Sequence, residues 1–382
     1  MIRILTAHTR EIDDIAIATA EILEQLDLDG RLLRHSVGIL AFHPDFLESG
    51  AVRAVSAALP FSTMGGTTSN MAVTGAMGDL MLIVTVLTSD DVTFEAGAVL
   101  LENDPRAGIQ DLYAQLASRS AEKPSLLLTV APVMSNIGGD DFIEALDAVS
   151  GGVPLFGSLA VSPQTDFGGT ATCLNGEHQE RLFTLLAVFG NVNPEFYTTV
   201  IPADMVIHQG AVITKSEKHL IQSINGLVPL DYLESIGLAA NGDILGISSI
   251  PFVLTTDDGS AIVRSAYRST DEGYIMAYGT VPQGARIGFA GCDAQFVLQS
   301  ARENIGRALA AGGRNALIVA CDARRWTLGI RPTAEMREVA ECLDNVLPYR
   351  IAYAAGELCP VRNHKGELLN KFQNFSTIAC RL

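Results

Sequence analysis

Short apolar runs and amphipathic segments alternate along most of the chain, and the same order occurs three times. Each repeat opens with an apolar run, at 35–44, 125–132 and 315–324. A segment with apolar residues every three or four positions follows, and two further apolar runs complete the repeat. Spacing of three and four is typical of helices with one buried face, whereas short continuous apolar runs are typical of buried strands. The pattern predicts three related units, each a strand, a helix and two strands.

Many of the predicted strands are apolar at nearly every position, as in 80–87 and 125–131. Strands of this kind are covered on both faces, by a second sheet or by helices. In the second half an Asp-Asp-Gly turn at 257–259 separates two strand-like runs, 251–255 and 260–268, and predicts an antiparallel hairpin. We therefore expect an α+β fold in which mixed, mostly antiparallel sheets pack together in layers, with helices on the outside.

The composition indicates a folded protein with a large core, since 48% of the 382 residues are hydrophobic and 18% are charged. A turn-rich segment at 190–194 predicts two domains, 1–193 with two of the units and 194–382 with the third. The net charge of −17 argues against a nucleic-acid partner, because no basic patch would collect phosphates against that field.

No apolar run approaches the roughly 20 residues of a membrane helix. The first residues include Glu11 and lack the long apolar stretch of a signal peptide. The cysteines lie mostly within apolar runs, which is typical of buried thiols in a reducing compartment. These features predict a cytoplasmic protein without membrane insertion.

The second strand of each unit contains a glycine, at Gly66, Gly157 and Gly356. The residues that follow these glycines are Thr67, Ser158 and Glu357. A glycine inside a strand marks a bulge or a point where another group approaches the backbone closely. Two interpretations remain open: a packing bulge that is repeated with the fold, or three related binding loops of which only the last carries a charge.

Arg324 ends the first strand of the third unit, and its guanidinium is suited to binding a carboxylate through two parallel hydrogen bonds. The alternative is a surface ion pair with Asp322 or Glu335. Glu357 lies among apolar strands, where an unpaired charge is unfavourable. It is suited either to receiving an ammonium group or to neutralising Arg324.

Cys321 lies beside two arginines, which would lower the pKa of its thiol, and His364 is suited to act as its base. This pairing gives an alternative hypothesis, a cysteine-dependent hydrolase or transferase. The competing interpretation is a small buried residue in an apolar strand. Histidines and cysteines lack metal-binding spacing, and neither a P-loop nor a dinucleotide-binding glycine motif follows a strand, so we expect no metal and no cofactor.

Several segments, taken in order, resemble the FIST sensory family and cover nearly the whole chain as an N-terminal and a C-terminal half. The resemblance rests on 61–70, 78–86, 151–161, 181–190, 315–329 with Glu335, 355–363 and 372–382. The sequence departs from the family at Ala323, Gln373, Phe375 and Ser376, where Gly, His, Gln and Thr are common.

The resemblance implies a cytoplasmic sensor of small molecules, for which amino acids are the suggested ligands. Bacterial members are often fused to signalling output domains. Because the chain stops at Leu382 without one, we expect a small polar metabolite as ligand and a separate signalling protein as partner. The candidate ligand-binding residues are Arg324, Glu357, Asn374, Gly356, Cys321, Gly66, Thr67 and Ser158.

Overall fold

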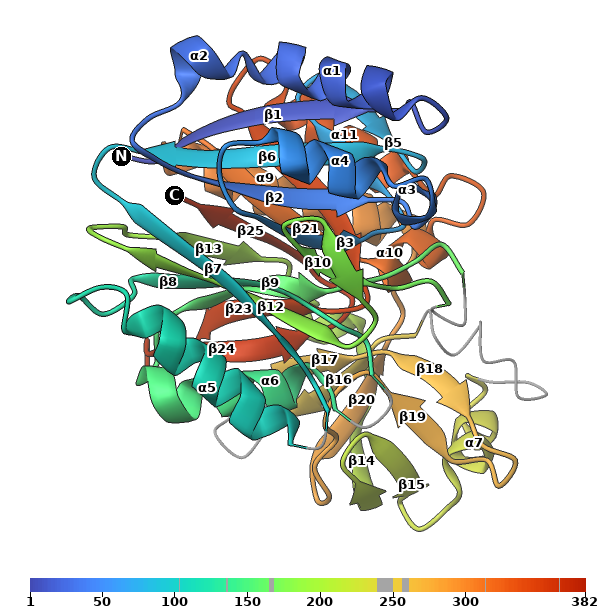
Figure 1. Ribbon diagram of the computed structural model, residues 1–382. Helices are drawn as coiled ribbons and strands as arrows, with labels where there is room; N and C mark the ends of the chain where they lie inside the picture. The colour runs from blue at the N-terminus through green and yellow to red at the C-terminus, as the bar shows by residue number, and fades with distance from the viewer. Residues whose placement is uncertain are drawn as a thin grey trace.

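The computed structural model describes residues 1–102, 104–134, 137–164, 168–238, 250–255, 261–312, 314–363 and 365–382. Within these ranges the chain forms three six-stranded sheets and one seven-stranded sheet (Figure 1). Each six-stranded sheet is built mainly from one of the three predicted units. The layered α+β fold expected from the sequence is therefore confirmed.

All three units have the same order of elements. The first contains β1 (Arg3–Thr9), α1 (Ile15–Leu26), α2 (Leu28–Arg31), β2 (His35–Phe42), α3 (Asp45–Glu48), α4 (Ala51–Ala58), β3 (Thr63–Thr67), β4 (Met71–Val73), β5 (Ala76–Gly78) and β6 (Leu82–Ser89). The second contains β7 (Thr93–Leu100), α5 (Pro105–Ala117), β8 (Leu126–Ala131), α6 (Gly139–Ser150), β9 (Leu155–Leu159), β10 (Thr172–Leu174), β11 (Glu177–Gln179) and β12 (Leu182–Phe189). The third contains β13 (Glu195–Thr198), α9 (Ala294–Ala310), β21 (Ala316–Cys321), α10 (Asp322–Thr327), α11 (Ala334–Leu343), β22 (Tyr349–Ala354), β23 (Glu357–Arg362), β24 (Leu368–Gln373) and β25 (Thr377–Arg381).

Each unit places one hairpin in the sheet of another unit. The hairpin β4–β5 of the first unit pairs with β22 of the third, and β10–β11 of the second pairs with β3 of the first. The hairpin β23–β24 of the third unit pairs with β9 of the second. This cyclic exchange joins the three units, and the sheet of each unit is complete only when another unit supplies two of its strands.

The strand registers correct the predicted match of the three glycines. In the parallel pairs β2–β3 and β8–β9, Gly65 lies opposite Leu40 and Gly157 lies opposite Thr129. A Cβ atom on either glycine would lie 2.3 or 2.2 Å from the carbonyl oxygen of that neighbour, so both positions require glycine. Gly157 therefore corresponds to Gly65, one residue before Gly66, and Gly356 follows β22 and has no counterpart in this set.

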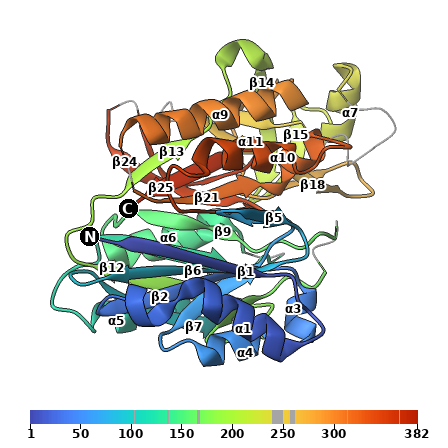
Figure 2. The same cartoon turned by 90° about the horizontal axis from the view of Figure 1, so that it is seen from above.

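The three sheets enclose one core, and helices cover their outer faces. Apolar side chains from all three sheets meet in the centre, among them Ile39, Leu128 and Val319. Outside them, α1 and α4 cover the first sheet, α5 and α6 the second, and α9 and α11 the third (Figure 2). Burial on both faces explains why the strands are apolar at successive positions.

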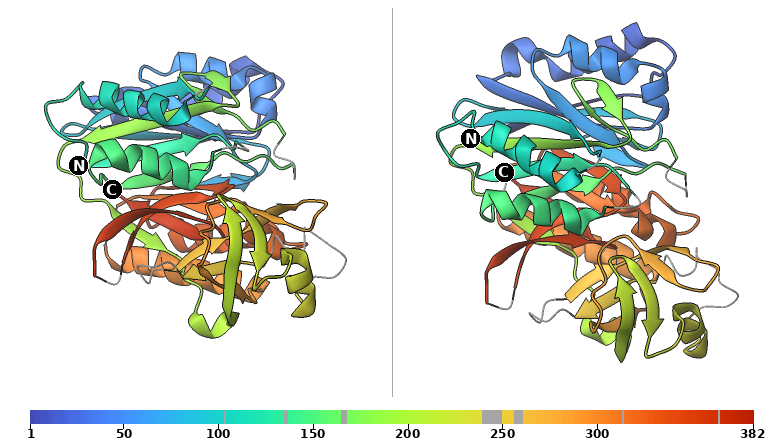
Figure 3. Two further views of the ribbon diagram at one scale, coloured as in Figure 1. Left: turned by 90° about the horizontal axis from the view of Figure 1, so that it is seen from below. Right: turned by 60° about the horizontal axis from the view of Figure 1, so that its bottom comes forward.

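The seven-stranded sheet is inserted into the third unit, between β13 and α9. Its elements are η1 (Ala203–Met205), β14 (Val206–Glu217), β15 (Leu220–Ile224), α7 (Pro229–Ser235), β16 (Phe252–Thr255), β17 (Ala261–Arg264), β18 (Ala266–Ser269), β19 (Ile275–Ala277) and β20 (Arg286–Ala290). Strands β16 and β17 pair antiparallel, which confirms the predicted hairpin, although its turn at 257–259 lies outside the described residues. Figure 3 shows this insertion at one end of the molecule. In the described part of the chain, no helix combines the length and apolar character that a bilayer crossing needs.

Candidate functional site

The three units meet where their parallel strands end, and hydrogen bonds join every pair of units there. Val161 N–H donates to the Thr67 carbonyl oxygen at 3.1 Å, and Leu159 N–H donates to that of Gly356 at 3.0 Å. The Thr68 hydroxyl donates to the Tyr353 carbonyl oxygen at 2.8 Å. We call this region the three-unit junction, and define it by residues 67–70, 158–162 and 353–357.

The three-unit junction brings together several residues that the sequence singled out. Ser158 and Glu357 lie opposite each other in the β9–β23 pair, and Gly356 directly precedes Glu357, the first residue of β23. The Thr67 hydroxyl accepts a hydrogen bond from Ala171 N–H at 3.2 Å. Thr67, Ser158 and Glu357 are buried, so they contribute to the packing between units and are not exposed to solvent.

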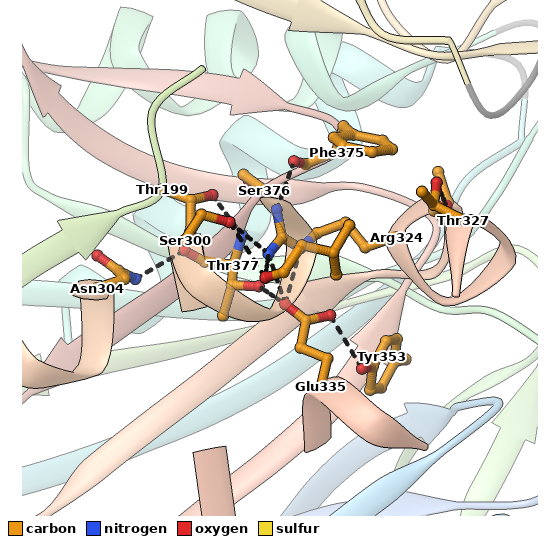
Figure 4. Close-up of polar contacts among 12 residues, drawn as sticks. Thr199, Ser300, Asn304, Arg324, Thr327, Glu335, Tyr353, Phe375, Ser376 and Thr377 are labelled. Carbon is orange, nitrogen blue, oxygen red and sulfur yellow. Dashed lines mark hydrogen bonds and ion pairs between the residues drawn. The ribbon is translucent and has the colours of Figure 1, made fainter. Parts of the chain in front are cut away.

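Arg324 is fully buried and makes its polar contacts within the protein (Figure 4). Its guanidinium pairs with Glu335 at 2.7 Å and donates to the carbonyl oxygen of Val297 at 2.8 Å and to the hydroxyl of Ser300 at 3.0 Å. Glu335 in turn accepts hydrogen bonds from the Thr377 hydroxyl at 2.6 Å and from the Tyr353 hydroxyl at 3.1 Å. The geometry supports the ion-pair interpretation of Arg324, with the pair in the interior and not at the surface as expected.

Glu357 is also fully buried, but it is not the partner of Arg324. One carboxyl oxygen accepts a hydrogen bond from the Ser376 hydroxyl at 2.6 Å, and the other makes none within the described residues. Burial raises the pKa of Glu357 to about 8, although Ser376, Cys321 and Arg324 act to lower it. Glu357 is therefore mostly a neutral acid at pH 7, which corrects the expectation of a charged Arg324–Glu357 pair.

Cys321 lacks the surroundings of an activated thiol. It is buried at the end of β21, and burial raises the pKa of its thiol well above the ordinary value, with Glu357 as a further cause. His364, the predicted base, lies outside the described residues. Asn374 is buried as well, and its amide bridges Ser265 N–H at 3.4 Å and the Ala355 carbonyl oxygen at 3.5 Å. This contact joins the inserted sheet to the third unit.

A cavity of about 640 Å³ lies next to the three-unit junction. It is lined by Val133, Met134, Ile137, Gly138, Asp141, Leu159, Gly168, Gly169, Thr170, Glu180, Arg181, Lys218, His219, Tyr267, Ala277, Tyr278, Gly279 and Thr280. None of the eight candidate residues is among them. Leu159 connects the two regions, because it lines the cavity and also directly follows Ser158 in β9.

The walls of the cavity are held by turns and helix ends from distant parts of the chain. The turn of the β14–β15 hairpin carries Lys218 and His219, whose carbonyl oxygens accept hydrogen bonds from Val281 N–H at 2.8 Å and Ala277 N–H at 2.9 Å. Burial lowers the pKa of His219, which Asp141 raises and Lys218 lowers. The imidazole is thus mostly neutral at pH 7, and the acid and the base that act on it line the same cavity.

Tyr278 lies in the cavity wall and is electrostatically coupled to the end of β21. Its ring stands 4.8 Å from that of Tyr267, centroid to centroid, and both residues line the cavity. Burial raises the pKa of Tyr278, and the neighbouring Cys321 and Asp322 raise it further. Cys321 ends β21, and the adjacent Asp322 accepts a hydrogen bond from the Ser69 hydroxyl of the three-unit junction at 2.5 Å.

Models of two protein-family domains match the chain and together cover most of it. The FIST N domain matches residues 36–227, and the FIST C domain matches residues 230–360. The chain belongs to the FIST family. FIST domains are generally sensor domains in signal transduction. A search of curated proteins found no match.

The cavity lies between the two FIST regions. Its walls from Val133 to His219 come from the FIST N match, and those from Tyr267 to Thr280 come from the FIST C match. Sequence reasoning did not find these residues, because they form no motif and come together only when the inserted sheet packs on the second unit. The one local signal is the polar Lys218-His219 pair between two strand-like runs.

An ion pair fixes the two FIST regions on each other beside the cavity. Arg264 of β17 is 1% exposed and binds both carboxylate oxygens of Asp140 in α6, at 2.9 and 3.0 Å. Asp140 also accepts a hydrogen bond from Thr280 N–H at 2.7 Å. A further Arg264 nitrogen donates to the Phe372 carbonyl oxygen at 2.8 Å, so one side chain holds the insertion, the second unit and β24 together.

Proposed function

We propose that this FIST protein is a sensor that binds a small polar molecule, such as an amino acid, in the cavity between its two FIST regions. The observation that carries the proposal is the position of the cavity, which joins polar and apolar walls from both regions. Ligand sites in proteins are commonly concave, mostly preformed and situated where domains meet. The family's sensory role supports the same choice.

The size of the cavity is suitable for such a ligand. Its volume of about 640 Å³ falls within the range of about 300–1,000 Å³ that is typical of small-molecule sites. Micromolar binding corresponds to roughly 8 kcal/mol, which is under about 1 kcal/mol for each of the roughly nine heavy atoms of a small amino acid. This binding free energy per atom is below the ceiling of about 1.5 kcal/mol per atom for very small ligands, provided that both charged ends of the amino acid are engaged.

The signal would pass to a separate signalling protein, which would read a change in how the two FIST regions sit on each other. The Arg264–Asp140 pair, in which the arginine is buried, supports this route, because it joins the regions next to the cavity. A ligand that contacts both walls binds one arrangement of the regions better than another, and only such a difference in affinity can shift the arrangement. The cytoplasmic location and the two-domain division at 193 and 194 stay predictions.

A cavity-filling variant tests the proposal. The twenty amino acids and small organic acids are screened by thermal shift on the wild type and on Gly138→Trp. Gly138 lines the cavity, and a Cβ atom there would meet only ordinary contacts, the nearest 3.4 Å away. Gly306→Trp is the control, because a Cβ atom at that position of α9 meets nothing within 4 Å.

We expect at least one compound to stabilise the wild type and Gly306→Trp but not Gly138→Trp. Stabilisation of all three proteins by the same compounds would place binding elsewhere. No stabilisation of the wild type by any compound would count against a sensor of this ligand class.

A further inference from the structure

The floor of the cavity is aromatic and apolar. Tyr267 and Tyr278 pack with their ring planes tilted by 37°, and both are only partly buried. Met134 and Leu159 also line the cavity, and both belong with Tyr278 to one apolar cluster. Tyrosine rings and a methionine thioether together favour a flat apolar group, because rings pack well against rings and sulfur contacts ring edges favourably.

The rim of the cavity is charged but balanced. Among its described residues, Asp141 and Glu180 are acidic and Arg181 and Lys218 are basic. Glu180, Arg181 and Lys218 are exposed, whereas Asp141 is half-buried at the start of α6. This balance is local, since the chain as a whole carries a net charge of −17. A ligand with one charge would leave one sign of the rim unmatched, whereas a zwitterion engages both.

Acidic and basic side chains line the same part of the cavity. Asp141 accepts a hydrogen bond from Gly138 N–H at 2.8 Å, and a Cβ atom on Gly138 would lie 3.4 Å from the Tyr278 carbonyl oxygen. The preceding residue, Ala277, donates its N–H to the His219 carbonyl oxygen at 2.9 Å, and Lys218 directly precedes His219. Asp141 and Lys218 both act on the His219 imidazole, Asp141 raising its pKa and Lys218 lowering it. The neutral His219 imidazole lines the same cavity and adds a donor and an acceptor without changing the charge balance.

We propose that the cavity selects zwitterions that carry a flat apolar group, with the charged end at the Asp141–Lys218 rim and the flat group on the Tyr267–Tyr278 floor. Aromatic amino acids are the simplest members of this class. The inference rests on the proposed function, because it assigns the ligand class of the same cavity.

Four probes separate the contributions of charge and ring, with dissociation constants measured by calorimetry on the full chain. L-Phenylalanine has both charges and the ring, 3-phenylpropionate lacks the ammonium, phenethylamine lacks the carboxylate and L-alanine lacks the ring. Each lost group removes a charge-assisted contact or a buried apolar surface, so we expect L-phenylalanine to bind about tenfold more tightly than each of the others.

Variants assign each contribution to its residue. Lys218→Gln should weaken the binding of L-phenylalanine about tenfold and leave the binding of phenethylamine unchanged, because phenethylamine has no carboxylate. Asp141→Asn should weaken the binding of L-phenylalanine and leave the binding of 3-phenylpropionate unchanged, because 3-phenylpropionate has no ammonium group. Tyr267→Leu should reduce the preference for L-phenylalanine over L-alanine. Lys123→Gln is the matched charge control, because Lys123 lies at the opposite end of α6, where it binds the Gly151 carbonyl oxygen.

The outcomes distinguish this inference from the proposed function. If compounds bind and Gly138→Trp abolishes binding, but L-phenylalanine shows no preference over the singly charged probes or L-alanine, the selection is refuted while the cavity remains the site. If 3-phenylpropionate binds as well as L-phenylalanine, the cavity is an anion site and the zwitterion assignment is wrong. If Gly138→Trp leaves all binding intact, both proposals fail together.

Discussion

Glu357→Gln should make the free energy of unfolding less dependent on pH, and the structure fixes both the sign and the size of the effect. The buried carboxyl has a pKa of about 8, against an ordinary value of 4.5. It therefore binds a proton more tightly in the folded chain than in the unfolded chain. Its stabilising contribution is fully present below the unfolded pKa and is lost as the pH rises through about 8.

The magnitude follows from the size of this shift. Each unit of pKa difference corresponds to about 1.4 kcal/mol, so the complete loss between pH 4.5 and pH 8 amounts to about 5 kcal/mol at most. Between pH 5.5 and pH 7.5 the free energy of unfolding of the wild type should fall by about 2 to 3 kcal/mol more than that of Glu357→Gln. Glutamine is neutral at every pH and keeps an oxygen that can accept the Ser376 hydroxyl hydrogen bond.

The assay is urea unfolding of both proteins at half-unit pH intervals from 5.5 to 8. Other titrating groups change in both proteins, so the difference between the two profiles isolates Glu357. Glu144→Gln, at an exposed position of α6, is the control for the loss of a surface carboxylate. Parallel profiles for the wild type and Glu357→Gln would refute the reasoning, because they would mean that the buried acid has the same proton affinity in both states.

Three further perturbations test the other contacts that hold the site. Arg264→Leu should destabilise the protein by about 3–5 kcal/mol in urea unfolding, because it leaves the Asp140 carboxylate without its ion-pair partner; an effect below about 1 kcal/mol would show that the pair does not hold the insertion. Gly157→Ala should cost about 3 kcal/mol, because the new methyl group meets the Thr129 carbonyl oxygen, and a stability equal to the wild type would contradict the register described above. Cys321 should resist a thiol-directed reagent at pH 7.5 in the native protein and react in 6 M urea, as mass spectrometry of the labelled peptide would show; rapid native labelling would revive the cysteine-enzyme hypothesis.

The strands and helices of the three units could be predicted from the sequence, because burial leaves a periodic apolar pattern. Helix α5 shows how local such signals are. Asp104 accepts a hydrogen bond from Ala107 N–H at 3.0 Å and Pro105 occupies the first turn, and both residue types are common at these helix positions. The exchanged hairpins were missed. Strands of three residues such as β4 and β10 leave no periodicity, and their partners lie in another unit.

The candidate site was predicted less well, for a related reason. The sequence drew attention to Arg324 and Glu357 because charged residues next to buried strands are unusual, and both are indeed buried beside the junction of the units. It offered Asp322 and Glu335 as possible partners of Arg324, but it could not show that Glu335, eleven residues away, is the partner or that the pair is buried. Nor could it place Lys218 in the same cavity as Asp141, because that arrangement depends on how the insertion packs and not on any spacing along the chain.

The exchanged hairpins also bear on how the chain is made. During synthesis β9 is made about two hundred residues before β23, the strand that pairs with its edge. The separation between β4 and its partner β22 is larger still. Until the partner strand has been made, each of these edges is open to pairing with other chains, as any unpaired strand edge is. A chain that stops before β23 therefore leaves the edge of β9 unpaired, so a truncation near residue 355 exposes a strand edge almost two hundred residues away from the cut.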